Sequence, residues 1–157
     1  LALRWGADAE NMRRAAILHD CTKYWSLEEH VALCDKYGVA LDPMERVTEK
    51  LLHSKTGAIL ARDVFGADDE AYDAIFYHTT ARANMSLAEK ILYMADYIEP
   101  NRKFDGVEEL RKLAYEDLDA AVARGAKMSI DEMVEMGRSV HHNTTEAYKF
   151  YRKGTLL

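Results

Sequence analysis

The sequence contains little cysteine or proline and no long apolar run. Its two cysteines, Cys21 and Cys34, do not have the spacing of metal ligands, and its two prolines leave long stretches without a helix breaker. No segment has the roughly 18 consecutive apolar residues of a membrane span, and no signal peptide is recognisable. We therefore expect a cytoplasmic protein with reduced thiols and no membrane partner.

Positive charge is also scarce and is not clustered. The 157 residues include 21 Lys plus Arg against 27 Asp plus Glu, a formal net charge of −6. Binding to long nucleic acid needs a basic surface that displaces counterions from the phosphate backbone. We therefore expect no nucleic-acid partner, although a few well-placed cations could hold a small anionic ligand.

Apolar residues recur along the chain at helical spacing. The i, i+3, i+4, i+7 pattern of an amphipathic helix begins at Met12, Ala71, Ala88 and Ile130. Further helices are expected over about 48–65, 107–124 and 144–152. No segment shows the period-two alternation of a strand. The predicted fold class is all-α, with residues 1–157 forming one domain built as a helical bundle.

Capping residues give expected helix ends. Ser-x-x-Glu capping boxes start at Ser86 and Ser129, and Gly125 is expected to end the helix before the second of them. Gly6 has the position of a C-cap after a helix that begins before Leu1. We therefore expect an N-terminal helix of the domain to precede the given sequence.

The segment AAILHDCTKYW, residues 15–25, places a histidine and an acid directly after an apolar run. On a helix, His19, Asp20 and Lys23 would project within one sector about 100° wide. His19 continues an inward-facing stripe, and burying Asp20 beside it would cost free energy without a partner. These three side chains are expected to converge at one place.

Three more candidate ligands lie on separate predicted helices. His78 ends the stripe that starts at Ala71, His53 begins another stripe, and Asp96 lies at the edge of the stripe from Ala88. A lone His-Asp pair is more often a hydrogen-bonded core histidine and its neighbour. Because imidazole and carboxylate together are the donors of divalent transition-metal sites, this repetition predicts a metal centre.

The ordered segments LHDCTK, LLHSK, YHTTARANMS and ADYIEPNR resemble the HD-domain phosphohydrolases, and within them the YqeK-type symmetrical bis(5'-nucleosyl)-tetraphosphatases. The resemblance implies an HD domain, active as a homodimer, that binds two metal ions. It implies iron, although manganese, zinc, nickel and cobalt accept the same donors. The implied reaction cuts diadenosine tetraphosphate into two ADP with a metal-bridging hydroxide, so ADP or GDP would be a product-like ligand.

Carried over residue by residue, the resemblance implies that Asp20 bridges the two metals. It assigns His19 and Asp96 to one ion, and His53 and His78 to the other. The family has a further ligand histidine on a preceding helix, at a position that would lie upstream of the given sequence.

The departing phosphate needs cations and hydrogen-bond donors beside the metals. The candidate substrate-binding residues are Lys23, Thr79, Thr80, Arg82, Asn101 and Arg102, and the candidate catalytic residues are Asp20 and Lys23. Each cation could instead be an ordinary surface residue, the threonines could simply end their helix, and Asn101 could lie in a plain turn after Pro100. The family's Gly-Arg-Pro is Ala-Arg-Ala here, which leaves the direction of Arg82 open.

The remaining histidines and Cys21 are interpreted as structural. His30 follows two glutamates and is expected in solvent, while His141 and His142 are expected to be exposed or to cap the last helix. Cys21 is interpreted as a small core residue.

Two other functions stay open beside the symmetrical tetraphosphatase. The chain could be another HD phosphohydrolase that acts on a nucleoside monophosphate, a deoxynucleoside triphosphate or a guanosine alarmone. It could also be a non-catalytic helical module that binds a nucleotide or a partner protein through a degenerate metal site.

Overall fold

Helical periodicity decides the architecture, and the all-α prediction is confirmed. The computed structural model describes residues 1–152, which contain helices and turns but no strand. The α-helices are α1 (Ala2–Trp5), α2 (Ala9–Leu18), α3 (Leu27–Lys36), α4 (Glu49–Asp63), α5 (Asp69–Tyr77), α6 (Leu87–Tyr97), α7 (Val107–Glu116), α8 (Leu118–Glu135) and α9 (His142–Tyr151). A 3-10 turn, η1 (Glu45–Val47), precedes α4. Residues 153–157 of the predicted domain lie outside the described residues.

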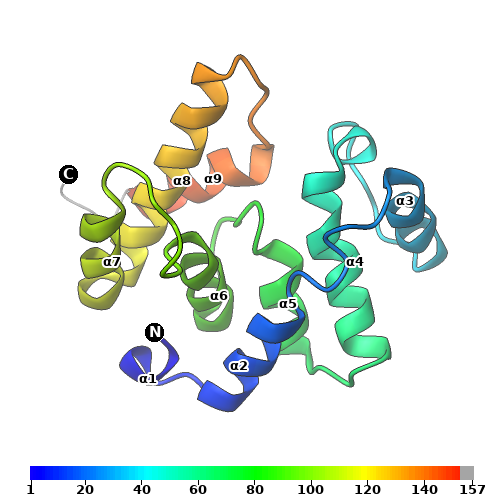
Figure 1. Cartoon of the computed structure of the whole chain (residues 1–157), viewed down its shortest axis with the longest axis horizontal. Helices are drawn as coiled ribbons and strands as arrows, with labels where there is room; N and C mark the ends of the chain where they lie inside the picture. The colour runs from blue at the N-terminus through cyan, green and yellow to red at the C-terminus, as the bar shows by residue number, and fades with distance from the viewer. Residues whose placement is uncertain (153–157) are drawn as a thin grey trace.

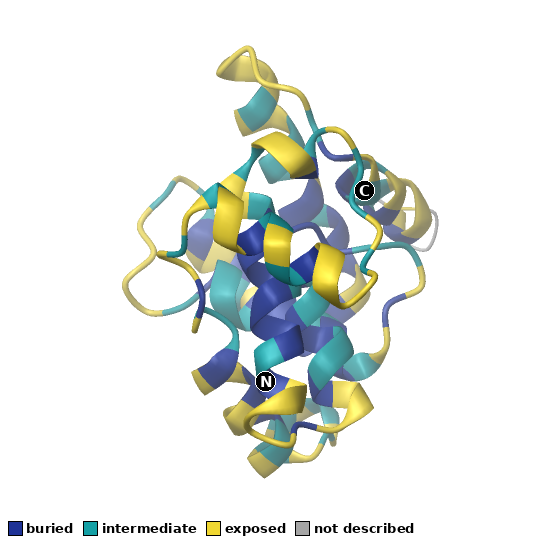
Figure 2. Cartoon of the chain, turned by 90° about the vertical axis from the view of Figure 1, so that its right-hand side faces the viewer, coloured by how far each residue is buried: buried dark blue, intermediate teal, exposed yellow. Residues whose placement is uncertain are grey.

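Helix α5 lies between three neighbours. It packs against α2, α4 and α6, and α6 in turn contacts α8, which pairs with α7 and α9 (Figure 1). Figure 2 shows the buried segments gathered in the middle of the molecule with exposed segments around them. The candidate ligands lie on or directly after α2, α4, α5 and α6, and the other three of these helices all pack against α5.

The packing around α5 relies on small side chains. Five fully buried core residues of α2, α4 and α5 are alanines: Ala15, Ala58, Ala61, Ala71 and Ala74. Alanine has good helix propensity and lets neighbouring backbones approach closely. This close approach brings the ends of α2 and α5 near the first half of α4.

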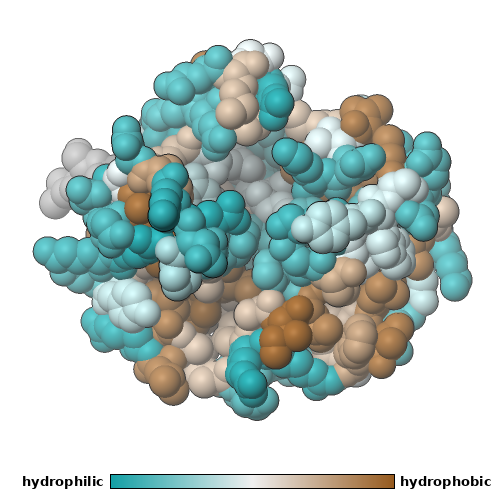
Figure 3. All heavy atoms as spheres, viewed as in Figure 1, coloured by the Kyte–Doolittle hydropathy of each residue, from teal (hydrophilic) through white to brown (hydrophobic). Residues whose placement is uncertain are grey.

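The surface is mixed rather than uniformly polar. Figure 3 shows apolar side chains among polar ones, mainly in the lower half of that face. Exposed large hydrophobic residues include Ile17, Val64 and Phe65. None of the described helices is both long enough and apolar enough to cross a membrane.

Local signals fixed some helix ends and misplaced others. The Ser86 capping box is confirmed, with both of its hydrogen bonds to Glu89, and Gly6 ends α1 in the left-handed region at φ 76°. The predicted helix boundary between Gly125 and Ser129 is wrong, because both residues lie inside α8. The predicted helix 107–124 is two helices, since the Asp117 side chain accepts a hydrogen bond from the N–H of Ala120 and starts α8.

Gly125 lies inside α8, where the helix packs against α6. A Cβ built at this position would lie 3.6 Å from the Met94 sulfur and 3.7 Å from a ring carbon of Tyr93. These are ordinary van der Waals distances, so a small side chain such as alanine would also fit here. The last helix starts at His142 rather than Thr144, with His141 as its N-cap.

Candidate metal centre

The His-Asp pair lies at the end of α2, whereas His19, Asp20 and Lys23 were predicted to lie together on one helix. Helix α2 ends at Leu18, and His19 is its C-cap with helical φ and ψ of −56° and −33°. Consecutive turns follow, in which the N–H of Lys23 donates to the carbonyl of Asp20 at 3.0 Å. Because these turns continue the helical path, Lys23 still folds back onto Asp20, with 2.6 Å between Nζ and Oδ2.

The Asp20 carboxylate lies between two sets of imidazoles. Its Oδ1 is 3.2 Å from Nε2 of His53 and 3.8 Å from Nε2 of His78. Its Oδ2 is 3.5 Å from Nε2 of His19. The two oxygens of one carboxylate therefore face different histidines, which is the arrangement that a shared ligand requires.

All five predicted ligands gather at this point, and we call them the HD cluster: His19, Asp20, His53, His78 and Asp96. Donor atoms of His19, His78 and Asp96 lie within 4.8 Å of one another, and so do those of Asp20, His53 and His78. The Nε2 atoms of His53 and His78 are 3.1 Å apart. Two nitrogens bound about 2.0 to 2.1 Å from one ion would be separated by about this distance.

Backbone carbonyls select the tautomer of two cluster histidines. Nδ1 of His19 lies 2.6 Å from the carbonyl of Ala16, and Nδ1 of His78 lies 2.7 Å from that of Ile75. A carbonyl only accepts, so each Nδ1 carries the proton and each Nε2 presents a lone pair to the cluster. Such bonds typically orient metal-binding histidines.

Electrostatics keep the cluster in the protonation states that metals require. Burial raises the pKa of Asp20, but the bond from Lys23 and the nearby His19 outweigh it, so that pKa falls below its usual value. The pKa of Asp96 is lowered further, because its bond with His19 and the nearby imidazoles outweigh burial. Burial lowers the pKa of His53, and it lowers the pKa of His78 to about 4.

His19 differs from the other cluster histidines. Burial lowers its pKa, but the bond to Asp96 and the carbonyl of Ala16 outweigh this, and the pKa is raised overall. Its Nε2 is 3.7 Å from Oδ1 of Asp96. A cation bound between these two groups would replace the proton that the pair otherwise attracts.

Two of the candidate substrate-binding residues contact carboxylates of the cluster, and two others make contacts outside it. Arg102 is 3.1 Å from Oδ1 of Asp96, and Lys23 pairs with Asp20. The Thr79 hydroxyl, one residue after His78, lies 3.1 Å from that of Ser54. Asn101 is exposed, and its N–H donates to Glu99.

Two candidates make other contacts among the described residues. Arg82 binds the buried carboxylate of Glu89 with Nε and Nη2 at 2.6 and 3.0 Å, and its guanidinium lies over the Tyr77 ring. Thr80 is buried, and its hydroxyl donates to the carbonyl of Ala81. Ala81 occupies the position of the family's glycine with φ 55°, a left-handed conformation that is unfavourable for alanine.

The interpretation of the remaining histidines was partly wrong. His30 is fully buried rather than solvated, and its Nδ1 lies 2.8 Å from the Thr56 hydroxyl. His141 does cap the last helix, since its Nδ1 accepts from the N–H of Asn143, but it is buried. Cys21 is exposed, not a core residue. The two glutamates before His30 lie on the exposed side of α3. Their polarity led to the wrong prediction that His30 is exposed as well.

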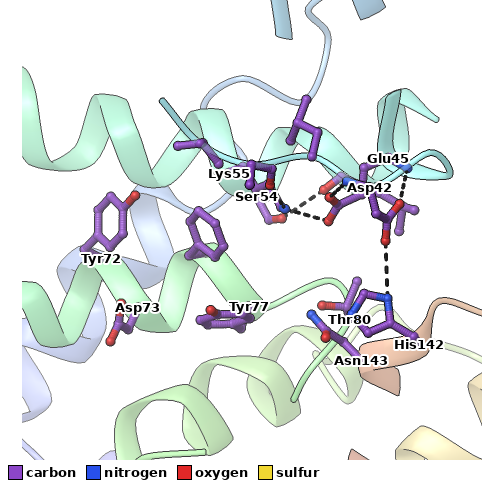
Figure 4. Close-up of a pocket in the computed structure, with 15 residues that line it drawn as sticks. Asp42, Glu45, Ser54, Lys55, Tyr72, Asp73, Tyr77, Thr80, His142 and Asn143 are labelled. Atoms are coloured by element: carbon purple, nitrogen blue, oxygen red, sulfur yellow. Dashed lines mark hydrogen bonds and ion pairs between the residues drawn. The ribbon is translucent and has the colours of Figure 1, made fainter. Parts of the chain in front are cut away.

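A cavity of about 620 Å³ lies on the opposite side of the α4–α5 pair. Phe76 and Lys55, which line it, are two residues from His78 and His53 and so project about 200° away from them. Figure 4 shows Tyr72 and Tyr77 of α5 in the cavity wall and His142 joined to Asp42 at its rim. The sequence reasoning did not identify this cavity.

The chain is similar to proteins of the HD family along most of its length. Residues 1–101 match the family model of the HD domain. The symmetrical bis(5'-nucleosyl)-tetraphosphatase of Bacillus subtilis is 38% identical over 156 residues, covering 99% of this chain and 83% of the relative. The enzyme of the same name from Halalkalibacterium halodurans is 37% identical over 149 residues, covering 94% and 79%.

A solved structure is also similar along nearly the whole chain. It is a predicted HD superfamily hydrolase involved in NAD metabolism from Clostridium acetobutylicum, with 41% sequence identity and a TM-score of 0.93. The match covers 98% of this chain and 82% of that one.

Proposed function

Since the chain belongs to the HD-domain family, among the symmetrical bis(5'-nucleosyl)-tetraphosphatases, we propose that it hydrolyses diadenosine tetraphosphate to two ADP. One water molecule is consumed, and the bond that breaks is the central phosphoanhydride. The observation that carries the proposal is the HD cluster, in which one carboxylate lies between two sets of imidazoles. Relatives with this name align with almost the entire chain, which supports the substrate.

The cluster residues fit a pair of divalent metal ions. Asp20 would be the shared ligand, His19 with Asp96 would hold one ion, and His53 with His78 would hold the other. We propose iron, because the family resemblance implies it and imidazole with carboxylate accepts it. Bound ions of this kind supply an acidified water and polarise phosphate oxygens.

Two cations beside the cluster would bind the phosphate chain. Lys23 and Arg102 each pair with a cluster carboxylate. We propose that they turn to the substrate's phosphates when metal ions neutralise those carboxylates, and that they stabilise charge on the departing ADP. Lys23 is the proposed catalytic cation, because it contacts the central carboxylate.

Polar groups on the surrounding loops are proposed as further substrate contacts. Thr79 and Asn101 would donate hydrogen bonds to phosphate oxygens. Arg82 and Thr80 would reach the substrate only by leaving Glu89 and Ala81, so we propose a mainly structural role for them. The single domain, the homodimer and the cytoplasmic location stay predictions.

Product analysis tests the proposed function. The protein is purified without oxygen, incubated with diadenosine tetraphosphate, and its products are resolved by anion-exchange chromatography. ADP alone, absent with Asp20→Ala, is the expected result. AMP with ATP would contradict symmetrical cleavage. No turnover by metal-loaded protein would favour another nucleotide substrate, to be found by comparing monophosphates, triphosphates and alarmones.

A further inference from the structure

A buried chain of hydrogen bonds runs from α3 to the HD cluster. Nδ1 of His30 lies 2.8 Å from Oγ1 of Thr56, which lies 2.8 Å from Oγ1 of Thr22. Oγ1 of Thr22 in turn lies 2.9 Å from the backbone carbonyl of His53. We call these residues the His30 relay; all four of them are buried.

The donors and acceptors of the relay can be assigned from elementary chemistry. The His53 carbonyl only accepts, so the Thr22 hydroxyl donates to it. The Thr22 oxygen then accepts the proton of the Thr56 hydroxyl, and Thr56 accepts from Nδ1–H of His30. The carbonyls of Leu52 and His53 also lie 3.1 and 3.4 Å from Oγ1 of Thr56, but the contact with Thr22 is shorter at 2.8 Å, and we assign the Thr56 proton to it.

The relay connects the turn that follows Asp20 to helix α4, and the spacing of these two segments sets the geometry of the cluster. Thr22 lies two residues after Asp20, and His53 is a cluster ligand on α4. Close packing supports the same junction, because a Cβ at Gly57 of α4 would lie 3.1 Å from the carbonyl of His19. The relay therefore helps to set the separation of 3.2 Å between Nε2 of His53 and Oδ1 of Asp20.

Fold stability alone does not favour histidine at position 30. Its Nε2 is buried and has no hydrogen-bond partner among the described residues. Burial lowers the pKa of His30, which favours a neutral ring whose only N–H is the one given to Thr56. A leucine of similar size would bury no unpaired nitrogen, so the advantage of histidine lies in that one donated bond.

We propose that His30 is a positioning residue, which acts through Thr56 and Thr22 to hold His53 in place for metal binding. This inference rests on the proposed function, since it assumes that the HD cluster binds metal. It needs no contact between His30 and a metal or the substrate.

Metal affinity, measured by competition with a chelator, tests the relay. In His30→Asn the side-chain amide nitrogen takes the place of Nδ1, whereas His30→Leu removes the donor at similar volume. We expect His30→Leu to bind metal about 10-fold more weakly, the lower end of the loss typical for outer-shell partners. His30→Asn should stay within threefold of the wild type.

A second pair of variants tests the other end of the relay. Thr22→Val removes the hydroxyl at constant shape and should match His30→Leu, while Thr22→Ser keeps the hydroxyl and should match the wild type. The double variant of Thr22→Val with His30→Leu should lose no more affinity than either single variant, because both break one chain. If His30→Leu does not fold, the Thr22 pair decides alone.

Cys34→Ala is the matched control for packing. Cys34 is buried one turn after His30 on α3 and has no part in the relay. We expect it to lower the melting temperature without changing metal affinity. Wild-type affinity in both His30→Leu and Thr22→Val would overturn the inference, whereas a wild type that binds no metal would instead contradict the proposed function.

Discussion

Two groups of histidines and carboxylates in this protein look alike by composition and distance. One is the HD cluster; the other, which we call the rim cluster, is formed by Asp42, His141 and His142 at the edge of the cavity. In the rim cluster Oδ2 of Asp42 lies 3.0 Å from Nε2 of His141 and 3.3 Å from Nδ1 of His142. These separations resemble those in the HD cluster.

The two groups differ in the histidine tautomer that backbone hydrogen bonds to Nδ1 select. In the HD cluster, carbonyls accept the Nδ1 protons of His19 and His78, so their Nε2 lone pairs face inward. In the rim cluster, Nδ1 of His141 accepts from the N–H of Asn143, so the ring proton lies on Nε2 and points to Asp42, and no lone pair of this ring faces the group. Donor type and distance are therefore insufficient evidence for a metal site.

The rim cluster connects distant segments instead. Nε2 of His141, at the start of α9, also lies 3.3 Å from Oε1 of Glu45 in η1. The same Glu45 oxygen lies 2.6 Å from Nζ of Lys55 in α4. Burial raises the pKa of Glu45, but its bonds with His141 and Lys55 outweigh this and lower the pKa to about 2. The rim cluster should therefore contribute to folding stability, and the HD cluster to metal binding.

Replacing one buried histidine in each group should give the largest difference between the HD cluster and the rim cluster. We expect His78→Ala to lower kcat/KM for diadenosine tetraphosphate by about 1,000-fold or more, because metal ions supply several kcal/mol of transition-state stabilisation. His141→Ala should stay within threefold of the wild type. Equal losses in steady-state assays of the two variants would contradict the separation of roles.

Acid unfolding should reveal the contribution of Glu45, the carboxylate that His141 of the rim cluster contacts. Because the folded pKa of Glu45 is lowered to about 2, its contribution is fully present above the unfolded value near 4.5 and is lost as the pH falls between these values. Between pH 6 and pH 2 the wild type should lose about 3 kcal/mol more than Glu45→Gln. Urea titrations at each pH measure this difference, and parallel curves would refute it.

Removing the His141 ring should cost stability. His141→Ala loses the N-cap of α9 and leaves the carboxylate of the buried Glu45 without one partner, so the free energy of unfolding should fall by about 1 to 3 kcal/mol. Urea unfolding at pH 7 tests this value. A change below 0.3 kcal/mol would mean that the rim cluster contributes little to the fold.

The smallest effect is expected at the outer member of the rim cluster. The His142 side chain is 67% exposed, so its contact with Asp42 is screened by solvent. His142→Ala should change the free energy of unfolding by less than about 0.5 kcal/mol and leave metal content unchanged. A loss as large as that of His141→Ala would show that both rings act as one unit.

Sequence reasoning predicted the HD cluster because each of its histidines ends or begins an apolar stripe. His78 and His53 were placed by periodicity alone, while the end of α2 at Leu18 was missed because the following turns keep helical geometry. The burial of His30 was missed because its immediate neighbours are glutamates. Its partners Thr22 and Thr56 become neighbours only when α3, α4 and the His-Asp turn pack together.

Contacts between elements add what local sequence patterns do not contain. The sequence around Ser129 has the form of a capping box, but α8, which packs against α6, α7 and α9, continues through it. The phosphate contact expected of Arg82 stays a prediction, and in this structure Glu89 of α6 binds its guanidinium. Local sequence patterns are compatible with several helix ends and side-chain contacts, and tertiary packing determines which of them form.

Metal content distinguishes the HD cluster from the rim cluster without any assumption about the substrate. Protein purified without oxygen would be analysed for transition metals as wild type, Asp20→Ala and His141→Ala, with circular dichroism to confirm folding. We predict two ions per chain in the wild type and in His141→Ala, and a loss of both in Asp20→Ala. Full metal content in Asp20→Ala, or metal lost from His141→Ala, would contradict the assignment of the metal centre to the HD cluster.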